Sequence, residues 1–546
     1  MTDKANIADF LPGMAARQPD AAAIICPWGR RGGRLTYRQL EERSGAIARG
    51  LEEIGITRGV RVVLMVPPGL DLFALVFALF KSGAVPVLVD PGIGLKHLKA
   101  CLGNAEPEAF IGVPKAHAAR VVLGWGRASV RTTVTAGRRL FWGGHTLAQV
   151  ERRGSSVPPR RSALTNADEV AAIVFTSGST GPPKGVIYRH GNFIAQVNAI
   201  RDAYGIEPGE VNLPTFPLFA LFDPALGMTT IVPDMDPTRP AKVDPRKIIS
   251  PIEEYGVTTM FGSPALLDTV GRWGEEHGVK LPSLRRVISA GAPVSPKVIE
   301  RFQSMLTGDA AIHTPYGATE SLPVATISSH EILSETRYAT DRGAGTCVGR
   351  PVDSIRAAVI RIDDEPISTW SEDLTVDDGE VGEIVVKGPQ VSREYHGAPA
   401  HDRLAKITDG EAIRHRMGDL GFSDDRGRLW FCGRKTHRVQ TDDGTLYTVP
   451  CESVFNTHPE VFRTALVGVG AVGAQRPVLC VELEPDVGAS EEARIREELF
   501  ALGAGFDHTE PIQTILFHPG FPVDIRHNAK IGRTALASWA TPRVLE

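Results

Sequence analysis

The stretch TSGSTGPPKG at residues 176–185 combines hydroxyl side chains, glycines and one lysine. Glycines let backbone N–H groups approach anionic oxygens closely, and Lys184 adds a positive charge. The composition therefore predicts a phosphate-binding loop. The alternative for a stretch rich in glycine and serine is a flexible polar turn at the surface.

The spacing within this stretch excludes two common phosphate loops. A Walker loop places GK after four residues and continues with Ser or Thr directly into a helix, whereas Lys184 follows a proline and precedes a glycine. The next residues, 186–188, are β-branched and aromatic, which predicts a strand, and a helix is expected only near Asn192. The dinucleotide pattern GxGxxG is also not matched at this position.

Alternating apolar segments around the loop predict a parallel sheet. Thr36 and Gln39 form a plausible capping box for a helix, and a later buried helix is expected to end at Gly83. Strand–helix–strand order with short connections implies parallel strands. Ligands bind beyond the carboxyl ends of such strands. The loops after the apolar runs 169–175, 256–264 and 284–293 are therefore expected to converge on one cleft.

The pattern changes toward the end of the chain. Residues 377–388 predict a turn and then a strand, and from about residue 436 the segments become shorter strands with two helical segments. We place a domain boundary at Arg434–Lys435. The prediction is a large domain over 1–434 and a small one over 435–546.

Composition bounds the functional class. The 546 residues are 42% hydrophobic and 23% charged with a formal net charge of −4, so no basic field indicates nucleic-acid binding. The six cysteines have neither CxxC nor zinc spacing, which predicts reduced thiols in a cytoplasmic protein. The N-terminus lacks the features of a signal peptide. Prolines and Asp71 interrupt the apolar run 60–92, so no transmembrane segment is expected.

Six further motifs follow the loop in a fixed order: SAGAPVS at 289–295, YGATE at 316–320, GEIVVKG at 382–388, MGDLG at 417–421, GRKTHRVQ at 433–440 and FPVDIRHNAKIGR at 521–533. With residues 176–185, they resemble the AMP-forming adenylating enzymes, which include acyl-CoA synthetases, peptide-synthetase adenylation domains and luciferases. The resemblance covers nearly the whole chain. It implies an α/β fold: a large N-terminal layered α/β domain with parallel sheets, a small mobile C-terminal α+β domain, and an active site between them.

The resemblance implies ATP and Mg²⁺ as cofactors and a role for each matching residue. The β/γ-phosphates would be bound by Thr176, Ser177, Thr180 and Lys184, with Gly178, Ser179 and Gly181 in the same loop, and adenine would be framed by Gly291, Ala292, Pro293, Tyr316 and Gly317. Thr319 would contact the α-phosphate, Glu320 would bind Mg²⁺, and Asp419 would bind the ribose with the help of Arg434. Lys530 would bridge the oxygens of the substrate carboxylate and the α-phosphate. Lys530, Thr319 and Lys184 form the catalytic set. A carboxylate that attacks an α-phosphate needs such positive charge and preorganised donors.

Each of three charged residues also has a purely structural interpretation: Asp419 could be a turn residue, Lys530 a surface lysine and Glu320 a helix cap. The order of the motifs favours the functional roles.

The motifs also depart from the common pattern: Met417 replaces Thr, Asp524 replaces Thr, Ala529 replaces Gly, Thr436-His437 stands in the hinge, and Gln440 replaces Lys. Most of these changes lie in the domain that rotates to form thioesters in the family. They disfavour CoA ligation more than adenylation. His527 is close to Lys530 in the sequence, and we interpret it as structural or solvent-facing.

The segment 215–227, TFPLFALFDPALG, is nearly all apolar and predicts either an alkyl-chain pocket or a core segment. Ala220 stands where CoA ligases often carry His. With the C-terminal motif, this segment resembles the β-lactone synthetase family of the bacterial long-chain olefin pathway. That resemblance implies adenylation of a 2-alkyl-3-hydroxy long-chain fatty acid and attack by its own hydroxyl, which gives a β-lactone, AMP and pyrophosphate.

Two other functions stay open from the sequence. One is an AMP-forming long-chain fatty acyl-CoA ligase or acyl-AMP synthetase, and the other is an inactive relative that binds nucleotide or lipid. The expected partners are the hydroxy fatty acid and other enzymes of the olefin pathway.

Overall fold

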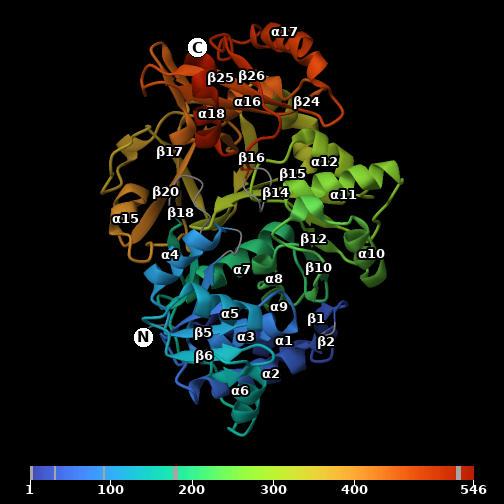
Figure 1. The fold of residues 1–546 in the computed structure, drawn as a ribbon, viewed down its shortest axis with the longest axis vertical. Helices are drawn as coiled ribbons and strands as arrows, with labels where there is room; N and C mark the ends of the chain where they lie inside the picture. Colours follow the sequence, from blue (N-terminus) through green and yellow to red (C-terminus); the bar gives the residue numbers. More distant parts are fainter. Residues whose placement is uncertain (1–3, 30–31, 90–92, 176–182, 524–529, 546) are drawn as a thin grey trace.

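The computed structural model describes residues 4–29, 32–89, 93–175, 183–523 and 530–545. Figure 1 shows a large lobe, which carries two extended sheets, and a small C-terminal lobe stacked on one end of it. The fold is mixed α/β with parallel strands at the centre of both large sheets, as predicted. Within the described part of the chain, no helix is both long and apolar enough to cross a membrane.

The first sheet of the large lobe has strand order β7-β6-β5-β3-β4-β8-β9. Its strands are β7 (His145–Thr146), β6 (Thr132–Thr135), β5 (Ala109–Gly112), β3 (Arg61–Met65), β4 (Val85–Val89), β8 (Val170–Phe175) and β9 (Gly185–Arg189). All neighbours are parallel except β8 and β9, which are antiparallel. The strand predicted after Lys184 is therefore confirmed, and residues 176–182, which join β8 to β9, lie outside the described residues.

Two helices of this half, α2 and α3, agree with the predictions from the sequence. The helices of this half are α1 (Phe10–Arg17), α2 (Tyr37–Glu52), α3 (Leu70–Ser82), α4 (Leu95–Ala105), α5 (Pro114–Leu123) and α6 (Leu147–Ser155). Thr36 and Gln39 form the predicted capping box of α2, and α3 ends at Gly83 in the left-handed conformation. Helix α3 is buried on nearly all sides, which explains its continuous apolar sequence.

The second sheet runs in the order β17-β18-β20-β21-β16-β15-β14-β13-β12-β10-β11-β1-β2, with β19 paired to β20. Its strands are β1 (Ala22–Cys26), β2 (Gly33–Thr36), β10 (Val211–Pro214), β11 (Thr229–Ile231), β12 (Thr259–Phe261), β13 (Arg286–Ile288), β14 (Ala311–Ala318), β15 (Ser321–Ser328), β16 (Thr346–Pro351), β17 (Arg356–Ile360), β18 (Gly382–Lys387), β19 (Lys406–Asp409), β20 (Ala412–Ser423) and β21 (Leu429–Arg434). Strands β10 to β14 are parallel, so their carboxyl ends meet at one edge.

Helices and short helical turns connect these strands. They are η1 (Ile7–Asp9), α7 (His190–Tyr204), α8 (Pro217–Ala220), α9 (Asp223–Leu226), η3 (Pro240–Lys242), α10 (Arg246–Tyr255), α11 (Pro264–Glu276), α12 (Pro296–Gln303), α13 (Ser329–Glu331), η4 (Ile332–Thr336), α14 (Arg337–Asp341), η5 (Glu372–Leu374) and α15 (Pro399–Ala405). Helix α7 begins at His190, two residues before the predicted start.

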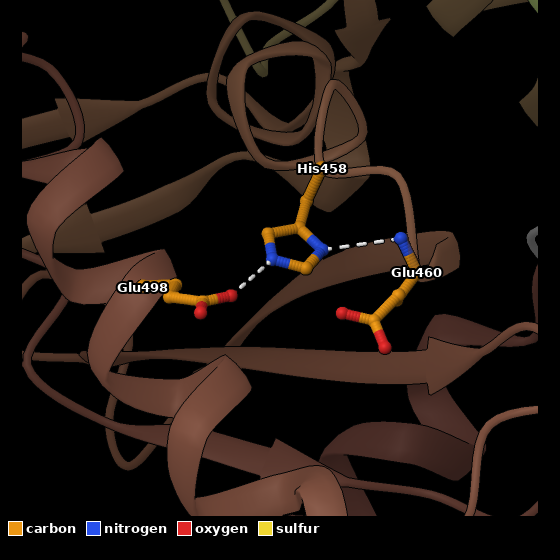
Figure 2. A group of neighbouring side chains, drawn as sticks. All are labelled: His458, Glu460 and Glu498. Carbon is orange, nitrogen blue, oxygen red and sulfur yellow. Dashed lines mark hydrogen bonds and ion pairs between the residues drawn. The ribbon is translucent and has the colours of Figure 1, made fainter.

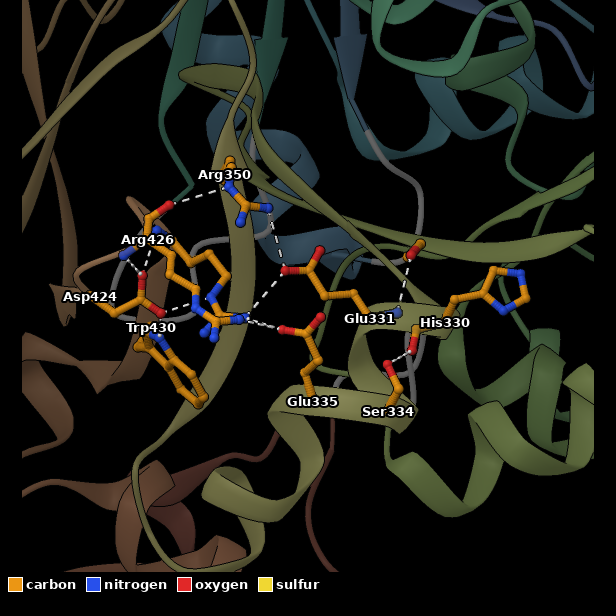
Figure 3. A network of polar contacts seen from close by, with 10 residues as sticks. His330, Glu331, Ser334, Glu335, Arg350, Asp424, Arg426 and Trp430 are labelled. Atoms are coloured by element: carbon orange, nitrogen blue, oxygen red, sulfur yellow. Dashed lines mark hydrogen bonds and ion pairs between the residues drawn. The ribbon is translucent and has the colours of Figure 1, made fainter.

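A network of charged side chains holds the β20–β21 hairpin against the helical segment after β15 (Figure 3). Arg428 at the hairpin donates to Glu331 and Glu335 at 3.3 and 3.2 Å, and its Nε donates to Asp424 at 2.7 Å. Trp430 donates to the same carboxylate at 2.9 Å. Because β20 and β21 carry Asp419 and Arg434, this network fixes two of the predicted site residues in place.

The small lobe contains η6 (Lys435–His437), β22 (Val439–Thr441), β23 (Gly444–Leu446), α16 (Thr448–Phe455), β24 (Val461–Val469), β25 (Arg476–Leu483), η7 (Ala489–Glu491), α17 (Glu492–Gly503), β26 (Ile515–Phe517) and α18 (Arg533–Leu545). The prediction of two helical segments was wrong, because three α-helices follow residue 436 in the described residues. The prediction did not say which segments these were; the first turn of α16, Thr-Val-Pro, has the composition of a strand or turn.

Polar contacts dock the small lobe on the large one. Lys435 Nζ lies 3.0 Å from Glu383 Oε2 and donates to the Asp363 carbonyl at 2.7 Å. Lys297 donates to the His458 carbonyl at 3.1 Å. The six cysteines are all free, as predicted, and all of them are buried.

Candidate active site

A cavity of about 1400 Å³ opens where the carboxyl ends of the parallel strands meet the small lobe. Every predicted site residue in the described part of the chain lines it: Lys184, Gly291, Ala292, Pro293, Tyr316, Gly317, Thr319, Glu320, Asp419, Arg434 and Lys530. The remaining predicted residues, Thr176, Ser177, Gly178, Ser179, Thr180 and Gly181, lie outside the described residues. Residues separated by more than 300 positions are thus brought to one site.

Parallel strands position the residues predicted for adenine. Gly291, Ala292 and Pro293 follow β13, and Tyr316 and Gly317 lie at the end of the neighbouring strand β14. A Cβ atom at Gly317 would lie 2.7 Å from the Ser321 carbonyl oxygen. Glycine is therefore required where the chain turns back into β15. Gly291 has a φ of 102°, which also favours glycine.

Asp419 has one carboxylate oxygen occupied and one available. Tyr316 Oη donates to Asp419 Oδ2 at 2.7 Å. Arg434, the cross-strand partner of Asp419, places Nε 3.1 Å from Oδ1 without the geometry of a hydrogen bond. This buried Oδ1 accepts no hydrogen bond from the described residues. A buried carboxylate oxygen without a donor suits a ribose hydroxyl.

Glu320 is held in a similar way in the turn between β14 and β15. Tyr395 Oη donates to Glu320 Oε1 at 2.6 Å, and no other side chain of the described residues donates a hydrogen bond to this carboxylate. Burial raises the pKa of the Glu320 carboxyl, but the groups around it, among them the Tyr395 hydroxyl and the Lys406 ammonium, lower it below its ordinary value. A charged carboxylate with one available oxygen fits Mg²⁺, which commonly binds through one or two carboxylates and substrate phosphates.

Two lysines lie against the ring of Tyr395. Lys184 Nζ is 5.4 Å from the ring centroid and Lys406 Nζ is 5.3 Å from it. Lys406 also donates to the carbonyl and hydroxyl oxygens of Ser392 at 2.6 and 3.1 Å. Burial lowers the pKa of Lys406 to about 8. Lys184, at the end of the predicted phosphate loop, and the Glu320 carboxylate therefore both contact Tyr395, the first at its ring and the second at its hydroxyl.

The small lobe contributes its own side chains to the cavity. Lys530 lines it, and its charge is one of those that oppose the rise in the Asp419 pKa caused by burial. Thr436 and His437 also line the cavity, and burial lowers the pKa of His437 to about 3, so its ring is neutral at pH 7. The altered residues of the C-terminal motif, Asp524 and Ala529, and the nearby His527 lie outside the described residues.

The apolar segment 215–227 forms part of the cavity wall. Its contributions are Thr215, Phe216, Leu218, Phe219, Leu221, Phe222 and Ala225. The segment also has the character of a core segment, because Ala220, Ala225 and Leu226 belong to a buried hydrophobic cluster. Ala220 is buried and faces a second cavity of about 130 Å³ beside the first. Ala220 therefore does not line the main cavity.

Several residues of the site were missed in the sequence. Three of them surround Glu320: Tyr395, Lys406 and His415. A fourth, Ser289, lines the cavity and has a buried hydroxyl without a hydrogen-bond partner among the described residues. Ser289 is the first residue of the SAGAPVS motif, and this position could have identified it as a site residue from the sequence. Nothing in the local sequence marks Lys406, because its partners Ser392 and Tyr395 lie in a different segment of the chain.

One cluster outside the cavity has the residue types of a metal site: His458, Glu460 and Glu498 (Figure 2). His458 Nε2 lies 2.8 Å from Glu498, and its Nδ1 accepts from the Glu460 backbone at 3.2 Å. Arg494 pairs with both carboxylates at 2.7 and 2.9 Å. Every group has a protein partner, so hydrogen bonds and ion pairs explain the cluster without a metal.

Comparison with known proteins points in one direction. Residues 13–396 match the family described as AMP-binding enzyme. The chain is 53% identical over 552 residues to the olefin β-lactone synthetase of Xanthomonas campestris pv. campestris, covering 99% of this chain and 98% of the relative. It is also 53% identical to the olefin β-lactone synthetase of Stenotrophomonas maltophilia, covering 99% of each chain.

Among solved structures, the amide bond synthetase McbA from Marinactinospora thermotolerans matches with a TM-score of 0.80 at 22% identity. The match covers 98% of this chain and 100% of that one. At this identity the likeness concerns the fold.

Proposed function

Since the chain belongs to the AMP-binding enzyme family, we propose that it activates a 2-alkyl-3-hydroxy long-chain fatty acid with ATP and closes the product to a β-lactone. The observation that carries the proposal is the 53% identity to two olefin β-lactone synthetases over 99% of the chain. The products are the β-lactone, AMP and pyrophosphate.

In the first half of the reaction, the substrate carboxylate attacks the α-phosphorus of ATP and pyrophosphate leaves. Asp419 Oδ1 binds the ribose, and the residues at 291–293 with Tyr316 hold adenine. Lys530 and Thr319 stabilise the oxygens around the α-phosphorus, while Lys184 and the loop 176–181 bind the leaving phosphates. Glu320 would hold Mg²⁺, which supplies charge neutralisation on the phosphate oxygens.

In the second half, the 3-hydroxyl oxygen attacks the acyl carbon, the bond from that carbon to the AMP oxygen breaks, and the hydroxyl proton is released. Attack within one molecule needs no second substrate and benefits from the high effective concentration of the hydroxyl. Cleavage of the activated acyl-adenylate bond supplies the driving force for closing a strained four-membered ring.

The apolar part of the cavity supports a substrate with two tails. One wall comes from η1, α3 and α7, where Phe80 lies 5.7 Å from Phe193, and Phe193 lies 6.2 Å from Phe222. A second wall begins at Phe219 and Phe261, whose rings are 4.4 Å apart, and continues to η3 and α11. An acid with alkyl groups on carbons 2 and 3 presents two chains that diverge from the reacting carbonyl.

The decisive experiment is product mass analysis. The purified chain is supplied with ATP, Mg²⁺ and a 2-alkyl-3-hydroxy acid, with and without CoA. We expect a β-lactone and AMP without CoA, and only pyrophosphate release with the matched acid that lacks the hydroxyl. A product that forms only with CoA would contradict lactone formation and support an acyl-CoA ligase.

A variant pair tests the first half separately. Lys530→Ala is expected to reduce pyrophosphate release by about 10²-fold or more while ATP binding, measured by calorimetry, changes little. Lys115→Ala, a change at an exposed lysine on α5, is the control. Unchanged pyrophosphate release in Lys530→Ala would remove this residue from the catalytic set.

Three further points are proposed on the same basis. The domain boundary lies at Arg434–Lys435, supported by two hydrophobic clusters made only of residues from 439 onward. The enzyme acts in the cytoplasm, and it works with other enzymes of the olefin pathway, which supply its hydroxy acid and consume its lactone.

A further inference from the structure

Exposed apolar side chains are concentrated on one part of the large lobe. Val121 and Val122 lie on α5, and Leu140 and Phe141 lie in the loop between β6 and β7. Val122 is 82% exposed and Phe141 is 76% exposed. We call these four residues with the cationic residues around them the α5 surface. Large exposed apolar side chains in a group mark interaction sites more often than single ones do.

The loop and the helix form one structural unit. His117 on α5 stacks on Trp142 with ring centroids 5.3 Å apart and an angle of 8°. Trp142 Nε1 donates to Thr135 Oγ1 at 2.9 Å, and the Phe141 ring lies 5.2 Å from that of Trp142. Val121 is one turn after His117, so it lies on the same side of the helix. The apolar side chains therefore stand out from a braced support.

Glycines delimit the loop between β6 and β7. Glycines with positive φ bracket it: Gly137 at 123°, Gly143 at 73° and Gly144 at 76°. Between them the sequence is Arg-Arg-Leu-Phe-Trp. Trp142 is anchored inward, whereas Leu140 and Phe141 are exposed.

The segment that carries these side chains contains cationic side chains and no acidic ones. No Asp or Glu occurs between Glu108 and Glu151, and this interval contains Lys115, Arg120, Arg127, Arg131, Arg138 and Arg139. None of the six forms an ion pair with a carboxylate in the described ranges. The whole chain nevertheless has a formal net charge of −4. Positive charge is therefore concentrated in this segment, where the Arg120 guanidinium lies 5.7 Å from the centroid of the buried Phe110 ring and the other five cations carry the charge of the α5 surface.

We propose that the α5 surface docks the enzyme on an anionic lipid bilayer, with Leu140 and Phe141 entering the interface and the arginines contacting lipid phosphates. Apolar side chains beside lysines and arginines are the combination that binds the membrane interface. Each basic residue near an anionic surface adds to the attraction. An acidic protein would match the charge, but it would need a far larger complementary area than four apolar side chains offer.

The surface is separate from the cavity. None of Val121, Val122, Leu140 and Phe141 lines it, and α5 lies in the part of the large lobe away from the small lobe (Figure 1). Docking through α5 therefore leaves the cavity and the small lobe unobstructed. The proposal depends on neither the reaction nor its substrate.

The experiment is cosedimentation of the full chain with vesicles, in the absence of ATP and acid. Vesicles of phosphatidylglycerol with phosphatidylethanolamine are compared with vesicles of phosphatidylcholine, at low and high salt. We expect binding to the anionic vesicles, weak binding to the neutral ones, and release as salt rises.

Two variants and a matched control locate the contact. Leu140→Ser/Phe141→Ser and Arg138→Gln/Arg139→Gln are each expected to weaken vesicle binding by at least about tenfold. Tyr338→Ser/Val472→Ser changes two other exposed apolar residues, 80% and 74% exposed, and is expected to bind as the unchanged chain does. Pyrophosphate release with a dissolved short-chain acid should be the same in all four proteins.

Three results would overturn the proposal: no binding of the unchanged chain to anionic vesicles, equal binding to neutral vesicles, or full binding by both test variants. Binding to a soluble acidic protein without vesicle binding would also overturn it and assign the surface to a protein partner. Because no substrate is present, these outcomes are independent of whether the lactone forms.

Discussion

Tyr395 sets what the Glu320 carboxylate can still bind. Its hydroxyl donates to Oε1 at 2.6 Å, while the amines of Lys184 and Lys406 lie 5.4 and 5.3 Å from its ring centroid. One side chain thus orients the carboxylate predicted to bind Mg²⁺ and supports the lysine predicted to bind phosphate. The contact depends on geometry that no local motif specifies.

Tyr395→Phe keeps the ring and removes the hydrogen bond to Glu320. We expect the Mg²⁺ concentration for half-maximal pyrophosphate release to rise about tenfold, because a hydrogen bond to a charged group contributes about 1.5 kcal/mol or more. Binding of ATP with Mg²⁺, measured by calorimetry, should weaken in parallel. Tyr338→Phe at an exposed tyrosine is the control, and an unchanged Mg²⁺ requirement would contradict the positioning role.

Ser289 presents a different residue-scale feature: the residue lines the cavity, and its buried hydroxyl has no partner among the described residues. Ser289→Ala should leave the melting temperature unchanged or slightly higher, because no other group loses a partner. We expect the KM for the 3-hydroxy acid to rise about fivefold and that for the acid without the hydroxyl to stay constant.

The matched control is Ser329→Ala. Ser329 Oγ donates to Gln303 at 2.7 Å and accepts from the Ile312 backbone at 3.0 Å, so its loss should lower stability by about 1–3 kcal/mol. A comparable loss of stability in Ser289→Ala, or an equal effect on both acids, would argue against a contact with the substrate hydroxyl.

At the scale of the element, α9 shows how the apolar segment 215–227 is anchored. Asp223 at its start accepts from Asn212 Nδ2 at 2.8 and 3.0 Å and from Thr230 Oγ1 at 2.9 Å. Burial raises the pKa of this carboxyl to about 7, and the hydrogen bonds only partly oppose that. The helix that forms part of the cavity wall is therefore tied to β10 and β11 by a carboxyl that titrates near neutral pH.

The sign of the resulting pH dependence follows from proton binding. Between about pH 4 and pH 7 the folded chain holds a proton on Asp223 that the unfolded chain has lost, so stability falls as pH rises. Relative to Asp223→Asn, the unchanged chain should lose about 2–3 kcal/mol more between pH 5 and pH 8, at about 1.4 kcal/mol per unit of pKa shift. Urea unfolding at both pH values measures this, and identical pH dependence in the two proteins would contradict it.

At the scale of the whole molecule, the site is complete only when the small lobe is docked. Lys530 is presented from the small lobe, whereas the other described candidates up to Arg434 come from the large one. Lys435 binds Glu383 and the Asp363 carbonyl directly after Arg434. This buried contact lies at the proposed junction between the lobes.

Lys435→Met should therefore loosen the docked arrangement. We expect the kcat for pyrophosphate release to fall about fivefold to tenfold with the KM for ATP little changed, since Lys530 would reach the α-phosphate less often. Small-angle X-ray scattering should report a larger radius of gyration. Arg272→Gln removes an exposed contact of 3.3 Å between the lobes and should change neither quantity measurably; equal behaviour of the two variants would contradict the prediction.

The sequence by itself determined the elements and the order of the motifs, because local composition specifies them. The capping box of α2, the buried helix ended by Gly83 and the strand after Lys184 all depend on neighbours a few residues away. Motif order also indicated which residues would share the site. The number of helices after residue 436 was predicted wrongly, since the stability of a short helix such as α16 comes more from packing than from its own residues.

Only the tertiary structure decided how the site residues are charged and which oxygens remain available. Asp419 and Arg434 become cross-strand partners, Tyr395 reaches Glu320 across 75 positions, and Lys406 is buried far from any motif. Burial, hydrogen-bond partners and pKa are properties of the packed interior, in which distant segments exclude water together. No local sequence carries that information.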